Sequence, residues 1–287
     1  MRKVLRWLGY ISAAILVLLL LFAAWVWVAS GRALSRTHAA APERLAAPSA
    51  AQLADVGRQA RILGCANCHG RGLEGGLVFD GQPFATVRAP NLTELAPRMS
   101  DQQLAAAIRQ GIGHDGRALF IMPSDMYSRL SDQEVAALIV AIRAAPRSGG
   151  PVAPIRWGPI GRFALATGGL RPVLATREDY RVREPLDTGP GEAAGRRLAA
   201  TTCAACHGPD LSGGGAEGGD RAPPDLAVAA AYDLAQFRTL LRTGVPPGGR
   251  DLGIMKEVAE RDFANFSDEE IARLHAYLRA RAERVAR

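Results

Sequence analysis

The sequence predicts a mainly α-helical protein with an N-terminal transmembrane helix followed by two small helical domains. Residues 7–30 carry no charge, and a bilayer is spanned by about 20 apolar residues. The rest of the chain contains an internal repeat, and each copy ends in a segment with a helix-capping signature. We therefore expect an anchor with its flanks in residues 1–36, a tether in 37–50, domains in 51–145 and 188–287, and an apolar connection in 146–187.

The positive charge is concentrated at the N-terminus. The formal net charge is +7, and residues 1–36 hold five basic residues and no acid, which leaves only +2 for the rest of the chain. This distribution argues against a nucleic-acid partner. Arg2, Lys3 and Arg6 precede the span and keep the N-terminus cytoplasmic by the positive-inside rule, although Arg32 and Arg36 follow the span. We expect a single-pass protein of the inner membrane with its domains in the periplasm.

Aromatic residues mark both ends of the apolar run. Trp7 and Tyr10 lie at one end, and Trp25 and Trp27 lie at the other, as expected for rings at the two membrane interfaces. The alternative is a cleaved signal peptide, whose apolar core is usually about 7–15 residues. The run in this chain is longer, which favours a retained anchor.

The two halves of the chain align along most of their length. Each copy ends in a capping box, formed by Ser131 and Glu134 in the first half and by Ser267 and Glu270 in the second. Between the predicted helices the density of glycine and proline is high, so we expect irregular loops there. The aligned segments are 57–65 with 195–203, 73–76 with 211–214, 88–92 with 221–226 after one insertion, and 108–111 with 241–244.

Two C-x-x-C-H motifs lie at equivalent positions of the repeat. This pattern attaches c-type haem, because two thiols add to the haem vinyl groups and the adjacent histidine reaches the iron. Thioredoxin-like redox pairs and zinc sites share C-x-x-C, but two copies that each include the histidine favour haem. We expect two covalently bound haem c groups, held by Cys65, Cys68 and His69 and by Cys203, Cys206 and His207.

The second axial ligand of each iron is expected to be a methionine. Met122 and Met255 lie upstream of the two capping boxes at matching positions of the repeat, and a thioether is a known distal ligand that raises the haem potential. Met255 is the only methionine after Met126. The competitors for the first haem are Met99, Met126 and His114. The other histidines, His38 and His275, are expected at the surface or in the tether.

A haem-binding histidine needs a hydrogen-bond acceptor for its other ring nitrogen. Pro90 and Pro224 lie where such an acceptor is expected. Arg88 and Arg221 either meet haem propionates or are solvated, and the sequence favours neither reading.

With these features, each half resembles a class I cytochrome c domain. The shared features are the first helix, C-x-x-C-H, a Pro-Asn-Leu type of loop, a distal methionine and a last helix. In that family the proline carbonyl accepts a hydrogen bond from the haem-binding histidine, which implies this role for Pro90 and for Pro224, with Pro223 adjacent. The tandem is also similar to membrane-bound cytochrome subunits of bacterial alcohol and gluconate dehydrogenases, which usually carry three haem motifs where this chain has two.

The resemblance implies an electron carrier rather than an enzyme. We expect it to pass electrons from a dehydrogenase or quinol-linked donor to a respiratory acceptor, with redox proteins as partners. The alternative is a dihaem redox enzyme, either a peroxidase or a sulfur-compound dehydrogenase, in which one haem ligand is exchangeable. A haem-based sensor or assembly factor is a remote third possibility.

The connection between the domains is unusually apolar. Ile155, Trp157, Ile160, Phe163 and Leu170 lie within it, and so large an apolar surface is rarely left in water. We expect it to pack between the domains, on a partner or at the membrane surface.

Overall fold

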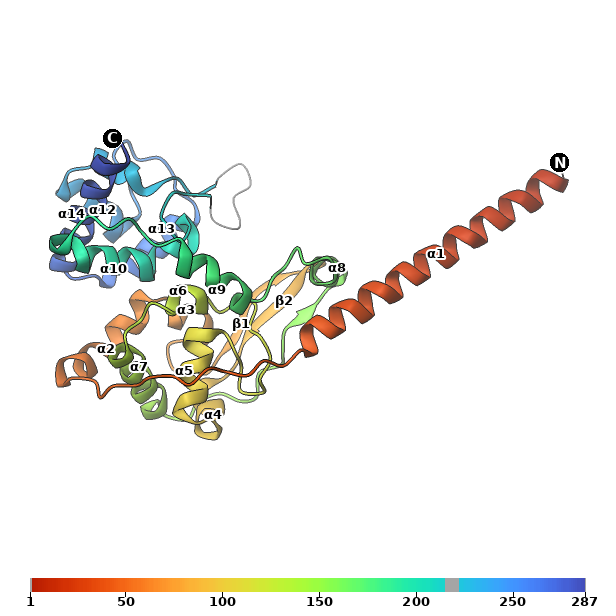
Figure 1. The fold of residues 1–287 in the computed structure, drawn as a ribbon, viewed down its shortest axis with the longest axis horizontal. Helices are drawn as coiled ribbons and strands as arrows, with labels where there is room; N and C mark the ends of the chain where they lie inside the picture. The colour runs from red at the N-terminus through yellow and green to blue at the C-terminus, as the bar shows by residue number, and fades with distance from the viewer. Residues whose placement is uncertain (1, 215–221, 287) are drawn as a thin grey trace.

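The computed structural model describes residues 2–214 and 222–286. Helix α1 (Arg2–Ser35) projects away from the rest of the molecule (Figure 1). Its apolar side chains are exposed, and the helix is long and apolar enough to cross a membrane. A helix of 34 residues rises about 51 Å, which exceeds the roughly 30 Å of a hydrocarbon core. The predicted span therefore lies within one continuous helix.

The first domain has a helical core. Helix α2 packs on α7, and α5 packs on both α6 and α7. Their apolar faces meet in a buried cluster that includes Leu104, Met126, Val135 and Ile139. The helices of this domain are α2 (Ala50–Ile62), α3 (Cys65–His69), α4 (Leu92–Leu95), the 3₁₀ helix η1 (Ala96–Arg98), α5 (Asp101–Gln110), α6 (Ser124–Tyr127) and α7 (Asp132–Ala144).

A three-stranded antiparallel sheet lies beside this core, where irregular loops were expected. Strand β1 (Gly76–Gly81) pairs with β2 (Ala85–Ala89), and β2 pairs with β3 (Arg156–Trp157) from the connection. Strands β1 and β2 are only six and five residues long, and glycines and prolines lie at or near their ends. Strands this short are hard to distinguish from loops in the sequence. The third strand, β3, also comes from a distant part of the chain, so no local pattern indicates the sheet.

The segment predicted as a tether lies against the first domain. Thr37 forms an isolated β-bridge with Arg117. Further along, Glu43 forms an ion pair with Arg109 at 3.0 Å, and their side chains are only 8% and 9% exposed. A buried arginine is costly without a charged partner, and Glu43 supplies that partner. The segment is therefore packed rather than free.

The connection folds into two helices with different neighbours. Helix α8 (Pro159–Thr167) packs against α1, and α9 (Val173–Val182) packs against α6 and α5 of the first domain. Tyr180 of α9 contacts the hydrophobic cores of both domains. Part of the apolar connection therefore fills the space between the domains, and another part lies at the foot of α1 (Figure 1).

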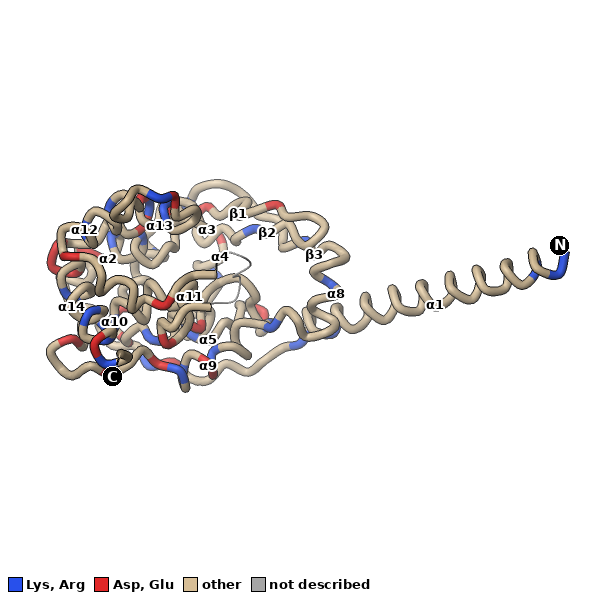
Figure 2. Tube along the Cα trace, turned by 90° about the horizontal axis from the view of Figure 1, so that it is seen from above, with Lys and Arg blue, Asp and Glu red and all other residues tan. Residues whose placement is uncertain are grey.

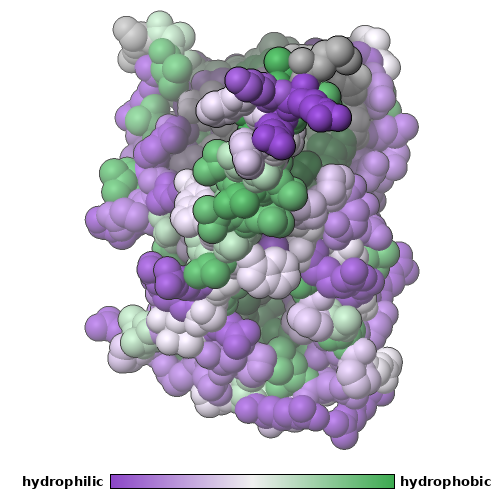
Figure 3. All heavy atoms as spheres, turned by 90° about the vertical axis from the view of Figure 1, so that its right-hand side faces the viewer, coloured by the Kyte–Doolittle hydropathy of each residue, from purple (hydrophilic) through white to green (hydrophobic). Residues whose placement is uncertain are grey.

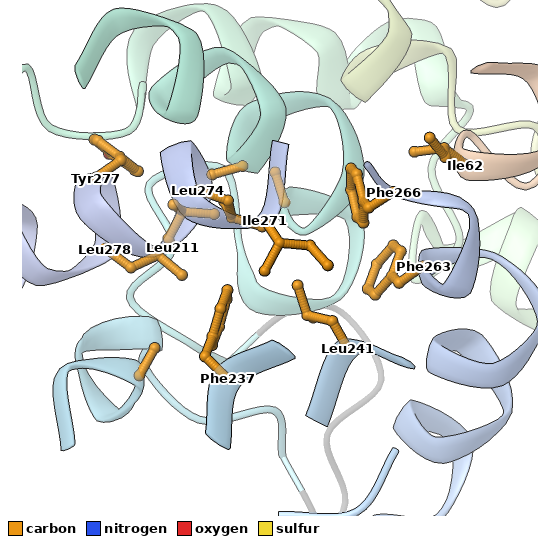
Figure 4. Close-up of a cluster of buried hydrophobic side chains, with 13 residues drawn as sticks. Ile62, Leu211, Phe237, Leu241, Phe263, Phe266, Ile271, Leu274, Tyr277 and Leu278 are labelled. Carbon is orange, nitrogen blue, oxygen red and sulfur yellow. The ribbon is translucent and has the colours of Figure 1, made fainter. Parts of the chain in front are cut away.

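The second domain repeats the helical plan. Helix α10 crosses α14 at Gly195, where an added Cβ would lie 2.7 Å from Cβ of Tyr277. Figure 4 shows its core, in which Phe237, Phe266 and Ile271 face one another and Ile62 of the first domain approaches from one side. Its elements are the 3₁₀ helix η2 (Pro190–Glu192), α10 (Ala193–Thr202), α11 (Ala204–His207), the 3₁₀ helix η3 (Leu226–Ala231), α12 (Leu234–Thr243), α13 (Ile254–Arg261), the 3₁₀ helix η4 (Phe263–Asn265) and α14 (Asp268–Val285).

Both predicted capping boxes are confirmed. The backbone N–H of Glu134 donates to Ser131 Oγ at 3.3 Å, and the N–H of Ser131 donates to the Glu134 carboxylate at 2.8 Å. Ser267 and Glu270 form the same pair at 3.1 and 2.8 Å. These reciprocal bonds satisfy the free amides of the first turn, so α7 and α14 begin where the sequence predicts.

His275 is buried, and its expected place at the surface or in the tether was wrong. It is 6% exposed, and its Nε2 lies 2.8 Å from the carbonyl oxygen of Tyr232. Its position four residues after Ile271 and three before Leu278 places it on the apolar stripe of α14. The carbonyl partner satisfies the ring nitrogen and makes this burial tolerable.

Candidate haem sites

The first C-x-x-C-H motif forms the short helix α3 and orients His69. Gly64 before it and Gly70 after it have φ of +75° and +77°, a conformation that glycine adopts without strain. His69 Nδ1 lies 3.1 Å from the carbonyl oxygen of Pro90. A carbonyl only accepts, so Nδ1 carries the proton and Nε2 carries the lone pair that a metal ion requires.

The second motif has the same geometry. His207, at the end of α11, has its Nδ1 2.8 Å from the carbonyl oxygen of Pro224. The neighbouring carbonyl, that of Pro223, instead accepts from the backbone N–H of Gly214 at 3.1 Å. Of the two adjacent prolines, Pro224 is therefore the one that orients the ring.

The loops that follow the two motifs match in unusual detail. Leu73 and Leu211 both adopt left-handed backbone conformations, with φ of 62° and 66°, which are rare for leucine. Gly75 and Gly213 each donate a backbone hydrogen bond to the carbonyl of the preceding motif histidine, at 2.8 Å in both halves.

Both of these glycines leave no room for a side chain. A Cβ at Gly75 would lie 2.6 Å from the carbonyl carbon of Pro90, and one at Gly213 would lie 2.8 Å from that of Pro224. The backbone therefore closes directly over the proline that accepts from the histidine. This close approach explains why the repeat has glycine at both positions.

The protonation of the two sites fits covalent haem attachment. Burial lowers the pKa of His69 and of His207, although their hydrogen bonds to the proline carbonyls oppose this. Both rings are therefore mostly neutral at pH 7, the form that binds a metal. Burial also raises the pKa of Cys65 to about 12 and that of Cys203 to about 11. A thioredoxin-like cysteine pair needs a lowered thiol pKa, so this geometry disfavours that reading.

One arginine beside the first motif has an unsatisfied donor. Nη1 of Arg88 is buried and has no hydrogen-bond partner. A buried unpaired donor costs about 1–3 kcal/mol, and a carboxylate would satisfy it. This observation fits a haem propionate better than it fits a solvated arginine. The counterpart Arg221 lies outside the described residues.

The four methionines among the described residues differ in their surroundings. Met99 and Met126 are 6% and 4% exposed and belong to the core of the first domain, whereas His114 is exposed. Met122 is partly buried at the edge of that core. Met255 is partly buried on the second core, on which Cys203 also packs. These positions leave Met122 and Met255 as the more accessible thioethers, and their ligand roles remain predictions.

Three contacts that the sequence did not predict join the motifs to their surroundings. Asn67, inside the first motif, donates to Asp262 at 2.7 Å. The Tyr127 hydroxyl donates to the carbonyl of Leu63, just before that motif, at 2.5 Å. The Tyr180 hydroxyl donates at 3.1 Å to the carbonyl of Ala204, between the cysteines of the second motif. For the two tyrosine contacts, the signal in the sequence was a tyrosine among apolar residues, because its hydroxyl needs a hydrogen-bond partner when it is buried.

Arg129 ties the second motif to the first domain. Its guanidinium lies 5.3 Å from the centre of the Tyr180 ring. It donates at 2.6 Å to the carbonyl of Tyr180 and more weakly to three others, those of Arg183, Ala200 and Pro209. Both C-x-x-C-H motifs therefore border the interface between the domains.

Comparison with known families defines the class of the protein. Residues 192–282 match the family model for cytochrome c. Residues 52–140 match the model for subunit III of the cbb3-type cytochrome c oxidase. The chain is a tandem c-type cytochrome with two cytochrome c domains, as its repeat and fold predict, and domains of this kind bind haem c.

A more particular likeness is to a dehydrogenase subunit. Over 250 residues the chain is 26% identical to the fructose dehydrogenase cytochrome subunit of Gluconobacter japonicus. The alignment covers 75% of this chain and 50% of the relative, so the chain spans about half the length of that protein. This finding confirms the resemblance to cytochrome subunits of membrane-bound dehydrogenases.

Proposed function

We propose that the chain is a dihaem c-type cytochrome that transfers electrons on the periplasmic face of the inner membrane. The observation that carries this proposal is the pair of matching loops in which His69 and His207 contact a proline carbonyl beside their C-x-x-C-H cysteines. Each bound haem supplies an iron that cycles between the ferric and ferrous states. Cys65, Cys68, His69, Pro90 and Met122 would hold the first haem. Cys203, Cys206, His207, Pro224 and Met255 would hold the second.

The arrangement of the domains suits an internal relay. Helix α13 carries Met255 in its first turn, and Asp262, which caps its C-terminal end, contacts the first motif through Asn67. Eight residues of α-helix rise about 12 Å. One short helix therefore separates the proposed ligand of the second haem from the attachment site of the first, which favours electron passage between them.

Membrane attachment would place the relay beside its partners. The basic residues Arg2, Lys3 and Arg6 keep the N-terminus of α1 in the cytoplasm, so the domains face the periplasm. The likeness to a dehydrogenase cytochrome subunit supports a dehydrogenase or a quinol-linked enzyme as the donor and a respiratory protein as the acceptor. The chain would then be an electron-transfer subunit and not the catalytic one.

The ligand assignment is tested by replacing the methionines one at a time. Met122→Ala and Met255→Ala should each abolish the methionine signature of one haem in the near-infrared spectrum and lower its midpoint potential, because the thioether raises the potential. Met126→Leu is the matched control, since Met126 is a core residue, and it should leave both spectra unchanged. An unchanged signature in Met122→Ala or Met255→Ala would reject that ligand.

A second measurement separates the carrier from an enzyme. The purified full chain should contain two haems, counted after alkaline pyridine treatment, and its reduced form should bind carbon monoxide slowly because both irons are saturated. Rapid binding at one haem would favour the dihaem enzyme. A count of one haem would contradict the proposal. Purifying the detergent-solubilised complex would identify the donor.

A further inference from the structure

Helix α8 has an apolar face that borders α1 and is about half exposed. Ile160 and Phe163 are 54% and 46% exposed, whereas Gly161 and Leu165 on the opposite side are buried. The only charged residue of the helix is Arg162. A helix at a water-facing surface normally presents polar residues outward, so this face is suited to an apolar environment.

The helix is seated against the foot of α1. The Phe163 ring lies 6.1 Å from the ring of Phe22. Arg162 lies 3.7 Å over the ring of Trp27 and donates to the hydroxyl of Ser30 at 3.1 Å. Figure 2 shows α8 beside the end of α1 that joins the domains. Its only charge is therefore directed towards α1 and not outward.

The position of α8 along α1 gives its depth in a bilayer. Twenty residues separate Trp7 from Trp27, a rise of about 30 Å, which equals the thickness of a hydrocarbon core. Phe22 lies five residues before Trp27, or about 8 Å deeper. Because Phe163 contacts Phe22, α8 reaches the depth at which interfacial helices bury their apolar faces, about 5–10 Å into the headgroup boundary.

The surroundings of α8 complement a lipid surface. A cavity of about 530 Å³ between α1 and α8 is lined by apolar side chains of both helices, by Trp157 and by Arg162. Residues 146–177 contain five arginines and no acidic residue. Arg162 is directed towards α1 and Arg171 pairs with Asp179 at 3.6 Å, and the other three arginines can attract anionic headgroups. Figure 3 views the molecule from the side on which α1 projects, so that α1 is seen end-on, and hydrophobic side chains gather near the centre of this view.

We propose that α8 is a second membrane contact, which lies in the outer headgroup layer with Ile160 and Phe163 among the lipid acyl chains. This inference rests on the proposed insertion of α1. Together the two helices would hold the cytochrome domains in one orientation on the membrane. A single helix in the membrane would leave them free to rotate about its axis.

Site-directed spin labelling of the full-length holoprotein tests this placement. Ile160→Cys and Phe163→Cys are labelled separately in vesicles of phosphatidylethanolamine and phosphatidylglycerol. Val182→Cys is the aqueous control, because Val182 is 66% exposed on α9. Leu18→Cys, in the middle of α1, is the membrane control. The accessibility of each label to oxygen and to a water-soluble nickel complex is then compared.

The labels at Ile160 and Phe163 should collide more with oxygen than with the nickel complex, as at Leu18, and the reverse should hold at Val182. If Leu18 reports lipid while both α8 labels report water, the inference is overturned and the membrane anchor stands. If both α8 labels are shielded from both reagents, a protein surface covers α8, which also overturns it. If Leu18 itself reports water, the proposed anchor fails.

Discussion

Replacing Gly195 by alanine tests the crossing of α10 over α14. The new Cβ would lie 2.7 Å from Cβ of Tyr277 and closer still to the carbonyl oxygen of Arg273, whereas ordinary contact begins at 3.4 Å. Both obstacles belong to the helix α14, so neither can rotate away. Overpacking of this kind costs about 1–3 kcal/mol, and the better helix propensity of alanine returns about 1 kcal/mol.

The expected net loss is therefore about 0–2 kcal/mol, and its upper end corresponds to roughly 10 °C in the melting temperature of a domain of this size. The matched control is Gly57→Ala at the equivalent position of the first repeat, where nothing lies within 4 Å of the added Cβ. That variant should gain about 0.5–1 kcal/mol. Calorimetry of both holoproteins measures the difference. Equal effects in the two variants would show that the close crossing of α10 and α14 does not exist.

Three further predictions concern the interface. Arg129→Met should lower the free energy of unfolding in urea by about 3 kcal/mol, because buried carbonyls lose a charged donor. The control Arg181→Met breaks only an exposed ion pair and should leave the free energy of unfolding unchanged. Burial, the largest single influence, raises the pKa of Glu270, but the hydrogen bonds from Arg58, the Ser267 backbone and Gln59, with the charge of Arg58, together lower it below its usual value of 4.5. The contribution of Glu270 is then complete above about pH 4.5 and lost as pH falls through the lowered pKa, so Arg58→Met should flatten the acid limb of stability measured against pH. Tyr180→Phe keeps the ring but removes the hydroxyl that donates to Ala204, so it should lower the free energy of unfolding by about 1 kcal/mol. It should also shift the midpoint potential of the second haem alone. An equal shift of both haems would contradict the contact with Ala204.

The loops around the two histidines were predictable because their determinants are local and repeated. The distance in sequence from His69 to Pro90 is short, and the second copy presents the same pattern at His207 and Pro224. The order of motif, glycine and proline recurs in both halves, although the proline follows the histidine by 21 residues in one and by 17 in the other, and this recurrence indicates one geometry. The helix starts at Ser131 and Ser267 were predictable for the same reason, since a capping box involves only four consecutive residues.

Features that depend on distant residues were not predictable. The burial of His275 requires the carbonyl of Tyr232 from another element. The packing of the predicted tether depends on Glu43 meeting Arg109, and no local pattern indicates which arginine an acidic residue will meet. The sheet has the same origin, because β3 comes from the connection and completes it from far along the chain.

The repeat specifies each site, but only the interface specifies the distance between the sites. Residues that line the two motifs also join the domains: Asn67 contacts Asp262, and Tyr180 contacts Ala204. A loosened interface would leave each histidine and proline pair intact, because those contacts lie within one domain. It would instead move one site away from the other. Interface variants such as Tyr180→Phe should therefore slow electron passage between the haems more than they alter electron entry from the donor.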